Sequence, residues 1–459
     1  MQTDSRNPLP VDEFTSAIEV RSARGIAAGI GRLIRSGTLQ IGDRLPTVRT
    51  IAADLGVSPA TVSEAWQSLA QAGVIESRGR AGTFVRTDTE THGPARYRRI
   101  THGPGAYERD YSTGIPDTEL LPDLSRATRH AELGDLTTNY FDDPVDPLLH
   151  EALAERWPFT PQAVTVVDGC LDALVRVANE VVRFGDRVLI ENPTFPPVLD
   201  MLGDLGADVI AVECDAFGPS PASLADGLAM GPVAFFYQPR GTNPTGVSVS
   251  AERADELAAL LAEHPEVAII ENDHAAAICT APPQSMGTRF PDRTTYVMGF
   301  SKSHGPDLRL AAVAGPADTV DAVATQRRLG PGWSSRIMQR LLAAMLNDPA
   351  TAAVVDTARS TYALRRNMLF AALADRGITP SGTDGIYAWI PVLDEASALI
   401  SLASRGIGAS PGSPFEAKRL EQPHLRVTVG LVADGVDELA DMIAAAAAIP
   451  PSSPHGRTL

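Results

Sequence analysis

The sequence has few cysteines and no long apolar run, and each shortage excludes a class of protein. Its three cysteines, Cys170, Cys214 and Cys279, are an odd number at wide spacings, so neither a disulfide framework nor a zinc site is predicted. No apolar run reaches the roughly eighteen residues of a membrane span, and the polar, acidic start lacks the features of a secretory signal. We therefore expect a cytoplasmic protein without a membrane segment or a metal site.

The chain is too long for one hydrophobic core. With 459 residues it predicts two or three domains. Its 44% hydrophobic and 21% charged residues are typical of a soluble globular protein and exclude a disordered one.

Charge is divided unequally along the chain, whose net charge is −17. Residues 21–86 hold nine arginines and four acidic residues, a net charge of +5, so the remainder carries −22. A small basic module joined to a large acidic body is typical of a nucleic-acid reader fused to another domain.

The basic module has the pattern of a winged helix-turn-helix. Apolar residues at helical spacing predict a helix over 23–37. A second helix follows Thr47, a capping residue, and ends at Gly56, and Ser58 caps a third. Two short apolar runs around the polar tip 78–82 then predict a β-hairpin, which in this place is a wing.

The rest of the chain predicts an α/β body after a linker. Residues 87–109 mix Thr, His, Gly, Pro and Arg without periodicity, as linkers do. Beyond them, strand-like runs alternate with helical stretches, which predicts a mostly parallel sheet with crossover helices. From about Leu341 the pattern changes to a smaller α+β subdomain. The strand-like runs are 163–167, 187–190, 209–212, 233–237, 267–270 and 295–298.

Lysine is almost absent, which makes the remaining lysines informative. Only Lys302 and Lys418 occur among 39 basic residues. Lysine differs from arginine in that it can lose its proton, act as a nucleophile and form a Schiff base. Lys302 directly follows a strand-like run, where α/β proteins place functional groups, whereas Lys418 has no such context.

The front module resembles the winged helix-turn-helix of the GntR family. The motifs that carry the resemblance are GDRLPTVR (42–49), LGVSPATV (55–62) and RGRAGTFV (78–85). The resemblance implies that the helix from Ser58 enters the major groove of double-stranded DNA and that the wing tip lies along the minor groove. The implied DNA-binding residues are Arg44, Thr47, Arg49, Ser58, Ala60, Thr61, Ser63, Arg78 and Arg80.

The body resembles the fold-type I pyridoxal phosphate enzymes. The segment Ser301-Lys302 is followed by Arg309 seven residues after the lysine, and NPTG (243–246) matches the family's asparagine turn. The resemblance implies pyridoxal 5'-phosphate bound to Lys302 as an aldimine. Its implied contacts are Gly169 and Cys170 at a helix start, Phe195 stacked on the ring, Asn243 on the phenolic oxygen and Arg309 on the phosphate. Ser301 is also among the implied cofactor-binding residues. Phe195 also suits a plain core position.

Further positions resemble substrate and subunit contacts. Gly114 and Arg426 resemble the residues that line the substrate side and hold its carboxylate, and a surface salt bridge is the alternative for Arg426. Tyr140 resembles a tyrosine that reaches the cofactor phosphate of the neighbouring subunit, which implies a homodimer.

The site also departs from the enzyme pattern. The family has an aspartate beside the pyridine nitrogen, and here either Asn272 or Asp273 takes that place. An asparagine would hydrogen-bond without stabilising a pyridinium charge. His274 or Ala275 replaces the usual tyrosine, and Gly299 replaces a phosphate-binding Ser or Thr. We therefore expect cofactor binding with reduced catalytic efficiency.

The two resemblances in this order are those of the MocR subfamily of GntR regulators. The implied division is a DNA-binding domain at 12–88, a linker at 89–109 and an aminotransferase-like effector and dimerisation domain at 110–459. We expect a transcriptional regulator that senses an amine or amino-acid effector, with at most a residual aminotransferase-type half-reaction. The alternatives are a working aminotransferase with an accessory DNA-binding domain, and a regulator whose body has lost the cofactor.

Overall fold

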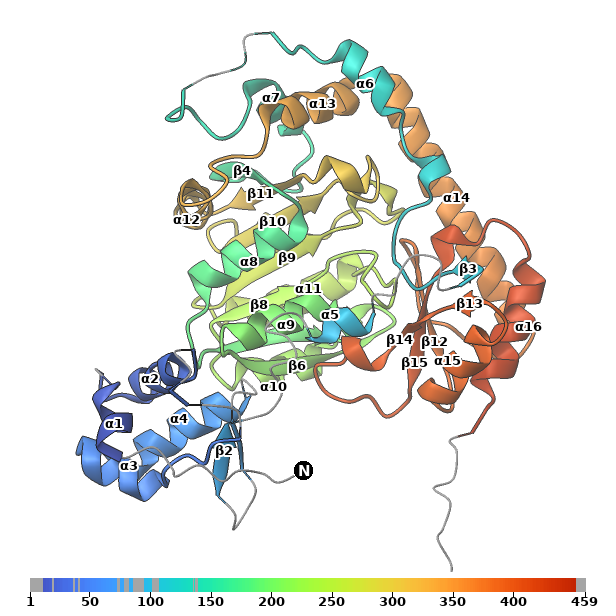
Figure 1. The fold of residues 1–459 in the computed structure, drawn as a ribbon. Coiled ribbons are helices and arrows are strands. Elements are labelled where there is room, and N and C mark those ends of the chain that lie inside the picture. The colour runs from blue at the N-terminus through green and yellow to red at the C-terminus, as the bar shows by residue number, and fades with distance from the viewer. Residues whose placement is uncertain are drawn as a thin grey trace, which may run out of the picture. The chain divides into compact units, whose positions relative to one another are not determined.

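The computed structural model describes residues 11–18, 20–35, 38–39, 42–71, 75–77, 82–85, 95–100, 107–134, 136 and 139–450. It contains two compact units (Figure 1). One comprises the described residues up to Ala95 with the short segments 183–186 and 202–208, and the other comprises the remaining residues. We call the described residues up to Val85 the head and those from Ala95 onward the body.

The head consists of helices followed by a hairpin. Thr47 caps α3, and its hydroxyl accepts a hydrogen bond from Thr50 N at 3.2 Å; Gly56 ends the helix at φ +67°. Ser58 Oγ accepts from Thr61 N at 3.1 Å at the start of α4. These predicted caps are confirmed. The elements are α1 (Val11–Ser16), α2 (Ala23–Arg35), α3 (Val48–Leu55), α4 (Pro59–Gln71), β1 (Ile75–Ser77) and β2 (Thr83–Val85).

Apolar side chains from all four helices and both strands close one core in the head. Phe14 of α1 is fully buried and its ring lies 6.4 Å from that of Trp66. The predicted hairpin is confirmed, since β1 and β2 pair antiparallel with Ile75 opposite Val85. The sequence analysis missed α1, because six residues are too few to show helical periodicity.

The body is built on an eight-stranded mixed sheet in the order β4-β11-β10-β9-β8-β5-β6-β7 (Figure 1). Strands β5, β8, β9 and β10 are parallel neighbours, as predicted. The strands are β4 (Ala163–Val167), β5 (Arg187–Asn192), β6 (Asp208–Asp215), β7 (Gly218–Pro219), β8 (Ala234–Tyr237), β9 (Ala268–Asp273), β10 (Thr294–Gly299) and β11 (Ala311–Gly315).

Strand β11 was not predicted. It pairs antiparallel with both β4 and β10 and is completely buried. Its sequence, AAVAG, contains one β-branched residue, so β-propensity does not mark it, and burial between two strands determines its conformation.

Helices cover both faces of the sheet. Ile269 of β9 packs in the cluster formed with α10 and α11, whereas α8 packs across β9, β10 and β11. The helices of the body before the C-terminal subdomain are α6 (Leu124–His130), α7 (Pro147–Leu153), α8 (Cys170–Val181), α9 (Pro196–Asp204), α10 (Pro221–Leu228), α11 (Ala251–Ala262), α12 (Ala317–Arg328) and α13 (Arg336–Asn347).

The predicted α+β subdomain is present at the C-terminal end of the body. Its three-stranded sheet has the order β12-β15-β14, and helices α14 and α16 pack together beside it. A large apolar cluster, which includes Leu373, Ile390 and Ile443, forms its core. The elements are α14 (Pro349–Ala374), β12 (Tyr387–Pro391), α15 (Glu395–Ala403), β13 (Ile407–Gly408), β14 (Ser410–Pro411), β15 (His424–Thr428) and α16 (Val436–Ala447).

The region expected to be a linker contains regular structure. Helix α5 (Ala95–Arg99) lies within it, and β3 (Arg109–Asp110) pairs in parallel with β13. Arg96 N donates to the carboxylate of Asp200 at 3.1 Å, and Ile100 is 6% exposed. Residues 95–100 therefore pack as part of the body.

Within the described parts of the chain, no helix combines the length and apolar character needed to cross a membrane.

Candidate functional site

A pocket lies at the carboxyl ends of parallel strands. Asn272 is close to the end of β9 and Lys302 follows β10, its parallel neighbour. The cavity encloses about 140 Å³. All the cofactor residues named from the sequence line it except Asp273 and Tyr140. The lining residues are Gly169, Cys170, Leu171, Leu174, Phe195, Gln238, Asn243, Asn272, His274, Ser301, Lys302, Arg309 and Tyr387.

Lys302 is held beside Gly114. Its Nζ donates to the Gly114 carbonyl at 2.5 Å, and the hydroxyl of Tyr387 donates to the same oxygen at 3.3 Å. Gly114 has φ +68°, and a Cβ there would lie 3.2 Å from the guanidinium of Arg426. Glycine is needed for this conformation and this close approach. The two predicted substrate-side residues, Gly114 and Arg426, therefore lie beside the lysine.

A cradle whose groups suit an anion lies at the start of α8. Gly169 is the N-cap residue with φ +104°, and no side chain caps the helix. Arg309 is close by, since a Cβ on Gly169 would lie 3.3 Å from its guanidinium, and Ser301 lines the same pocket. Free backbone N–H groups at a helix start, a guanidinium and a hydroxyl together suit a phosphate. Burial raises the pKa of the adjacent Cys170 thiol to about 12, so this side chain adds no negative charge.

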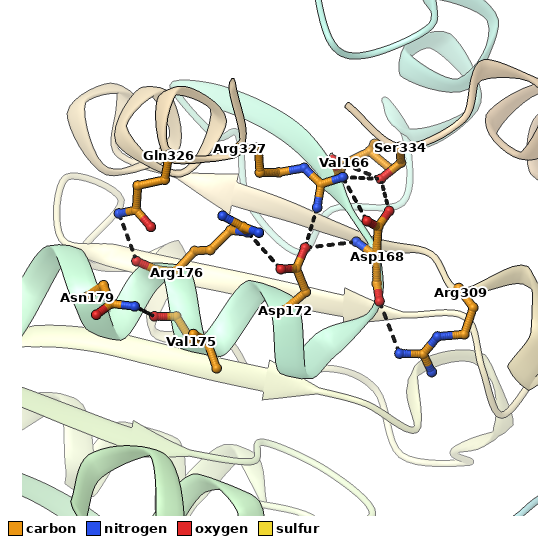
Figure 2. A network of polar contacts seen from close by, with 10 residues as sticks. All are labelled: Val166, Asp168, Asp172, Val175, Arg176, Asn179, Arg309, Gln326, Arg327 and Ser334. Carbon is orange, nitrogen blue, oxygen red and sulfur yellow. Dashed lines mark hydrogen bonds and ion pairs between the residues drawn. The ribbon is translucent and has the colours of Figure 1, made fainter. Parts of the chain in front are cut away.

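An ion-pair network around the buried Arg327 fixes the residue that precedes the cradle (Figure 2). Asp168 donates its N–H to the Asp172 carboxylate at 3.1 Å, and its carbonyl accepts from Arg309 at 3.2 Å. Its carboxylate accepts from Ser334 Oγ at 2.6 Å and from Arg327 at 3.0 Å. Arg327, at the end of α12, is 1% exposed and also pairs with Asp172. The network therefore positions both the cradle and Arg309.

Buried amide contacts hold the Asn243 turn in place. Asn243 N donates to Gln238 Oε1 at 3.0 Å, and Gln238 Nε2 donates to the Asn243 carbonyl at 3.2 Å. Gln238 Nε2 also donates to Glu191, whose pKa burial raises to about 8. Phe195 is partly buried and lines the same pocket.

The structure separates Asn272 from Asp273. Successive side chains of a strand point to opposite faces, and here Asn272 lines the pocket whereas Asp273 does not. The Asp273 carboxylate instead accepts from Arg240 at 2.7 Å and from the hydroxyl of Tyr296. Of the two alternatives, Asn272 is the one that faces the pocket, and its Oδ1 is buried without a hydrogen-bond partner in the described chain.

His274 is a second unpartnered polar group in the pocket. Neither ring nitrogen hydrogen-bonds to a described residue, and the ring stacks on that of Tyr387 with centroids 6.1 Å apart. Burial, with a smaller contribution from the charge of Lys302, lowers its pKa to about 4. The imidazole is therefore neutral near pH 7 and offers one donor and one acceptor.

Arg426 is a buried guanidinium without a carboxylate partner among the described residues. It is 2% exposed, donates to Asn243 Oδ1 at 3.2 Å and to the Ser112 carbonyl, and its Nε has no partner. Burial lowers its pKa. The guanidinium lies over the rings of Tyr387 and Phe415 at 5.2 and 5.1 Å. An unpaired buried cation of this kind suits a ligand carboxylate.

Tyr140 does not reach this pocket within one chain. Its ring packs on that of Trp333 with centroids 5.7 Å apart, and the residue is 81% exposed. Its expected contact with a neighbouring subunit's cofactor remains a prediction.

The predicted DNA-contacting residues of the head lie around α3 and α4. Gly82, at φ +109°, lies close to Arg44, because a Cβ there would be 2.7 Å from Arg44 Nε. Arg78 and Arg80 lie outside the described residues. The exposed members of the set are Arg44, Thr47, Arg49, Ser58 and Ala60, and the partly buried ones are Thr61 and Ser63.

Sequence reasoning missed Gln238, Tyr387 and Arg327. Gln238 precedes the recognised asparagine turn by five residues, which was an available signal. Tyr387 and Arg327 come from distant segments, and only the fold brings them to the site.

The residues of the pocket fit pyridoxal phosphate. The cradle offers N–H donors and a guanidinium, Lys302 offers an amine, and two buried polar side chains, Asn272 and His274, lack partners. Unpartnered buried polar atoms are costly, and a polar ligand would satisfy them.

Comparisons with known proteins match this division of the chain. Residues 110–443 match the family described as aminotransferase class I and II, and residues 22–85 match bacterial regulatory proteins of the gntR family. The vitamin B6 salvage pathway transcriptional repressor PtsJ of Salmonella typhimurium is 34% identical over 91% of this chain and 96% of its own. The HTH-type transcriptional regulator TauR of Rhodobacter capsulatus is 29% identical over 89% of this chain and 92% of its own.

A solved structure shares the fold of the body. Aspartate aminotransferase from Thermus thermophilus with maleate has a TM-score of 0.65 at 23% identity, covering 73% of this chain and 91% of that one.

Proposed function

Because the chain belongs to the aminotransferase class I and II family and carries a gntR-family regulatory domain in front, we propose that its pocket binds pyridoxal phosphate and an amino acid and controls DNA binding. The protein is a transcriptional regulator with a DNA-binding head and an aminotransferase-like body. The proposal concerns what the body senses. It is supported by one observation above the others: Lys302 and Arg426, which has no carboxylate partner among the described residues, both lie next to Gly114.

Different residues of the chain bind different parts of the cofactor. Gly169, Ser301 and Arg309 hold the phosphate, Phe195 stacks on the ring, and Lys302 supplies the amine. Asn243 and Asn272 hydrogen-bond the ring edge. Pyridoxal phosphate, when bound, supplies an aldehyde carbon that reacts reversibly with primary amines.

An amino acid suits the remaining space better than a simple amine. Arg426 would donate two parallel N–H···O bonds to its carboxylate, the geometry that a guanidinium provides. The ligand's amine would then lie toward Lys302, since Lys302 and Arg426 both lie next to Gly114.

The test is to compare the Arg426→Leu variant with the wild type, both loaded with pyridoxal phosphate. We expect the concentration of an effective amino acid that gives half of the change in visible absorbance to rise about 100-fold, because a buried charge-assisted pair is lost. The response to methylamine, which has no carboxylate, should be unchanged. Equal responses of the two proteins to amino acids would contradict the assignment of Arg426.

Pyridoxal phosphate itself is a second candidate for the sensed molecule. The relative from Salmonella is named a repressor of vitamin B6 salvage. In that case the cofactor alone would change the DNA affinity of the protein, with no amino acid present.

Asn272 favours a sensor over a working aminotransferase. A carboxylate beside the pyridine nitrogen would hold a proton there and draw electrons into the ring, and an amide does not. Asp273, the other residue considered for this position, is instead paired with Arg240.

The Asn272→Asp substitution is expected to increase residual chemistry. We predict that conversion of L-amino acids to keto acids by the loaded protein becomes at least about tenfold faster in single turnovers, because the carboxylate stabilises a protonated ring nitrogen. Asn272→Ala, the matched control, should give no increase. A wild type that already turns over as fast as the aspartate variant would favour the enzyme.

Arg44 and Arg49 are proposed to neutralise DNA phosphates. For the Arg44→Ala/Arg49→Ala variant, the slope of log affinity against log salt on duplex DNA should become shallower by about 2, since each lost phosphate contact removes about 0.9. The body variant Arg405→Ala/Arg419→Ala changes net charge equally and should keep the wild-type slope. Identical slopes for all three proteins would exclude the two head arginines from the interface.

A further inference from the structure

Helix α5 and Ile100, which we call the α5 segment (residues 95–100), are the first described part of the body after the head. Nine residues separate Val85 of β2 from Ala95. Sequence reasoning placed this segment in a featureless linker, yet polar contacts bind it to the body at both ends of the helix.

The contacts of the α5 segment are specific. Arg96 N and Tyr97 N donate to the Asp200 carboxylate at 3.1 and 3.0 Å, which satisfies two free N–H groups of the first turn. The Arg96 guanidinium donates to the carbonyls of Pro414 and Glu416 at 3.1 and 2.7 Å.

The apolar end of the segment lies behind the pocket. Ile100 is 6% exposed and packs in one cluster with Trp389 and Phe415, against which Phe195 also packs. Phe195 lines the ligand pocket, and Phe415 lies 5.1 Å from the Arg426 guanidinium. Ile100 is therefore separated from the ring side and from the carboxylate side of the pocket by one layer of side chains.

A backbone contact joins these two sides. Thr194 N, next to Phe195, donates to the Phe415 carbonyl at 2.8 Å. Through this hydrogen bond and the packed cluster, a shift of the Phe195 loop would be passed to Phe415 and Ile100, because a close-packed cluster leaves little free volume to absorb it.

We propose that the α5 segment is the element through which occupancy of the pocket controls the DNA-binding head. This rests on the proposed function. A ligand that stacks on Phe195 and pairs with Arg426 holds the cluster in one arrangement and so fixes the α5 segment, to which the head is tethered. In this proposal the cluster has two arrangements, and the ligand affects the head because it makes contacts in only one of them.

Hydrogen exchange of the full-length protein, with and without pyridoxal phosphate, tests this proposal without a known operator. In the wild type we expect the amides of Arg96 and Tyr97 to exchange at least about fivefold more slowly once the cofactor is bound. In Ile100→Ala the visible band at Lys302 should remain while this protection disappears.

Ile443→Ala is the matched control. Ile443 is 1% exposed and belongs to the core of the C-terminal subdomain, a cluster that contains no pocket residue. It should lose a similar amount of stability and keep the cofactor-dependent protection of α5, which separates coupling from general destabilisation.

Two results would overturn the inference in different ways. A wild type that binds pyridoxal phosphate with unchanged exchange at residues 96–97 would exclude the α5 segment as the coupling element and leave the proposed function intact. A wild type with no Lys302-dependent band would refute the proposed function and this inference together.

Discussion

Replacing Lys302 with alanine is expected to abolish the visible absorbance that the wild type acquires with pyridoxal phosphate. The amine of Lys302 lies in the pocket, 2.5 Å from the Gly114 carbonyl, and we propose that it is the nucleophile that binds the cofactor covalently. Without it only non-covalent contacts remain, and the dissociation constant of the cofactor should rise by about 100-fold or more. Absorbance titration measures both effects.

The scarcity of lysine supplies a nearly ideal control. Lys418, the one other lysine of the sequence, is 71% exposed and lies 3.7 Å from Glu213, so Lys418→Ala should titrate like the wild type. Lys302→Arg keeps the positive charge but cannot release a proton to become a nucleophile, and it should fail as alanine does. A visible band that survives in Lys302→Ala would show that another amine binds the cofactor.

Replacing Arg327 with methionine is expected to lower both stability and cofactor affinity. The guanidinium is 1% exposed and pairs with Asp168 and Asp172, and its removal leaves these two carboxylates without their shared cation. Breaking a buried pair costs about 3–5 kcal/mol, and we expect about 3 kcal/mol because the two carboxylates are partly exposed. Calorimetry of the body transition measures the loss.

The same substitution releases the phosphate cradle. The Asp168 carbonyl also accepts a hydrogen bond from Arg309. Without Arg327, Asp168 is no longer held in place, and we expect the dissociation constant of the cofactor to rise about tenfold. Arg176→Met is the control, because Arg176 pairs with the same Asp172 at 2.7 Å but only along one turn of α8. Arg176→Met should lower the free energy of unfolding by about 0.5 kcal/mol or less and leave the cofactor affinity unchanged. Equal effects of the two substitutions would refute a positioning role for Arg327.

Local signals predicted much of the fold. The caps Thr47, Gly56 and Ser58 were identified from the sequence because capping is an interaction between neighbours in the chain. The parallel strands were visible as apolar runs because strands buried on both faces carry little else. The short, alanine-rich β11 gave neither signal.

The site residues that belong to continuous motifs were predicted. Those that the fold brings together from distant segments were missed. Lys302, Asn243 and Arg309 belong to short motifs and lie together as expected. The choice between Asn272 and Asp273 depends on which face of β9 each side chain occupies. Because successive side chains alternate between the two faces, an alignment that is uncertain by one residue cannot assign the face. Arg327 lies 159 residues from its partner Asp168, so no local pattern connects them.

The predicted linker illustrates a further limit. The sequence around Tyr97 has no apolar stripe, because α5 is five residues long and uses backbone N–H groups and arginines for its contacts. Its buried apolar residue, Ile100, packs in a cluster with residues from a distant part of the chain, so the sequence alone does not mark it as buried.

The most direct test of the account is the DNA affinity of the full-length wild type and of Lys302→Ala, measured on duplexes that the wild type selects from a random library. Each protein is measured alone, with pyridoxal phosphate, and with pyridoxal phosphate plus a panel of amino acids. We predict equal DNA affinities for the two proteins alone, and a change of at least about tenfold on one of the additions for the wild type only. Affinities that never change in the wild type, or that change alike in both proteins, would contradict it.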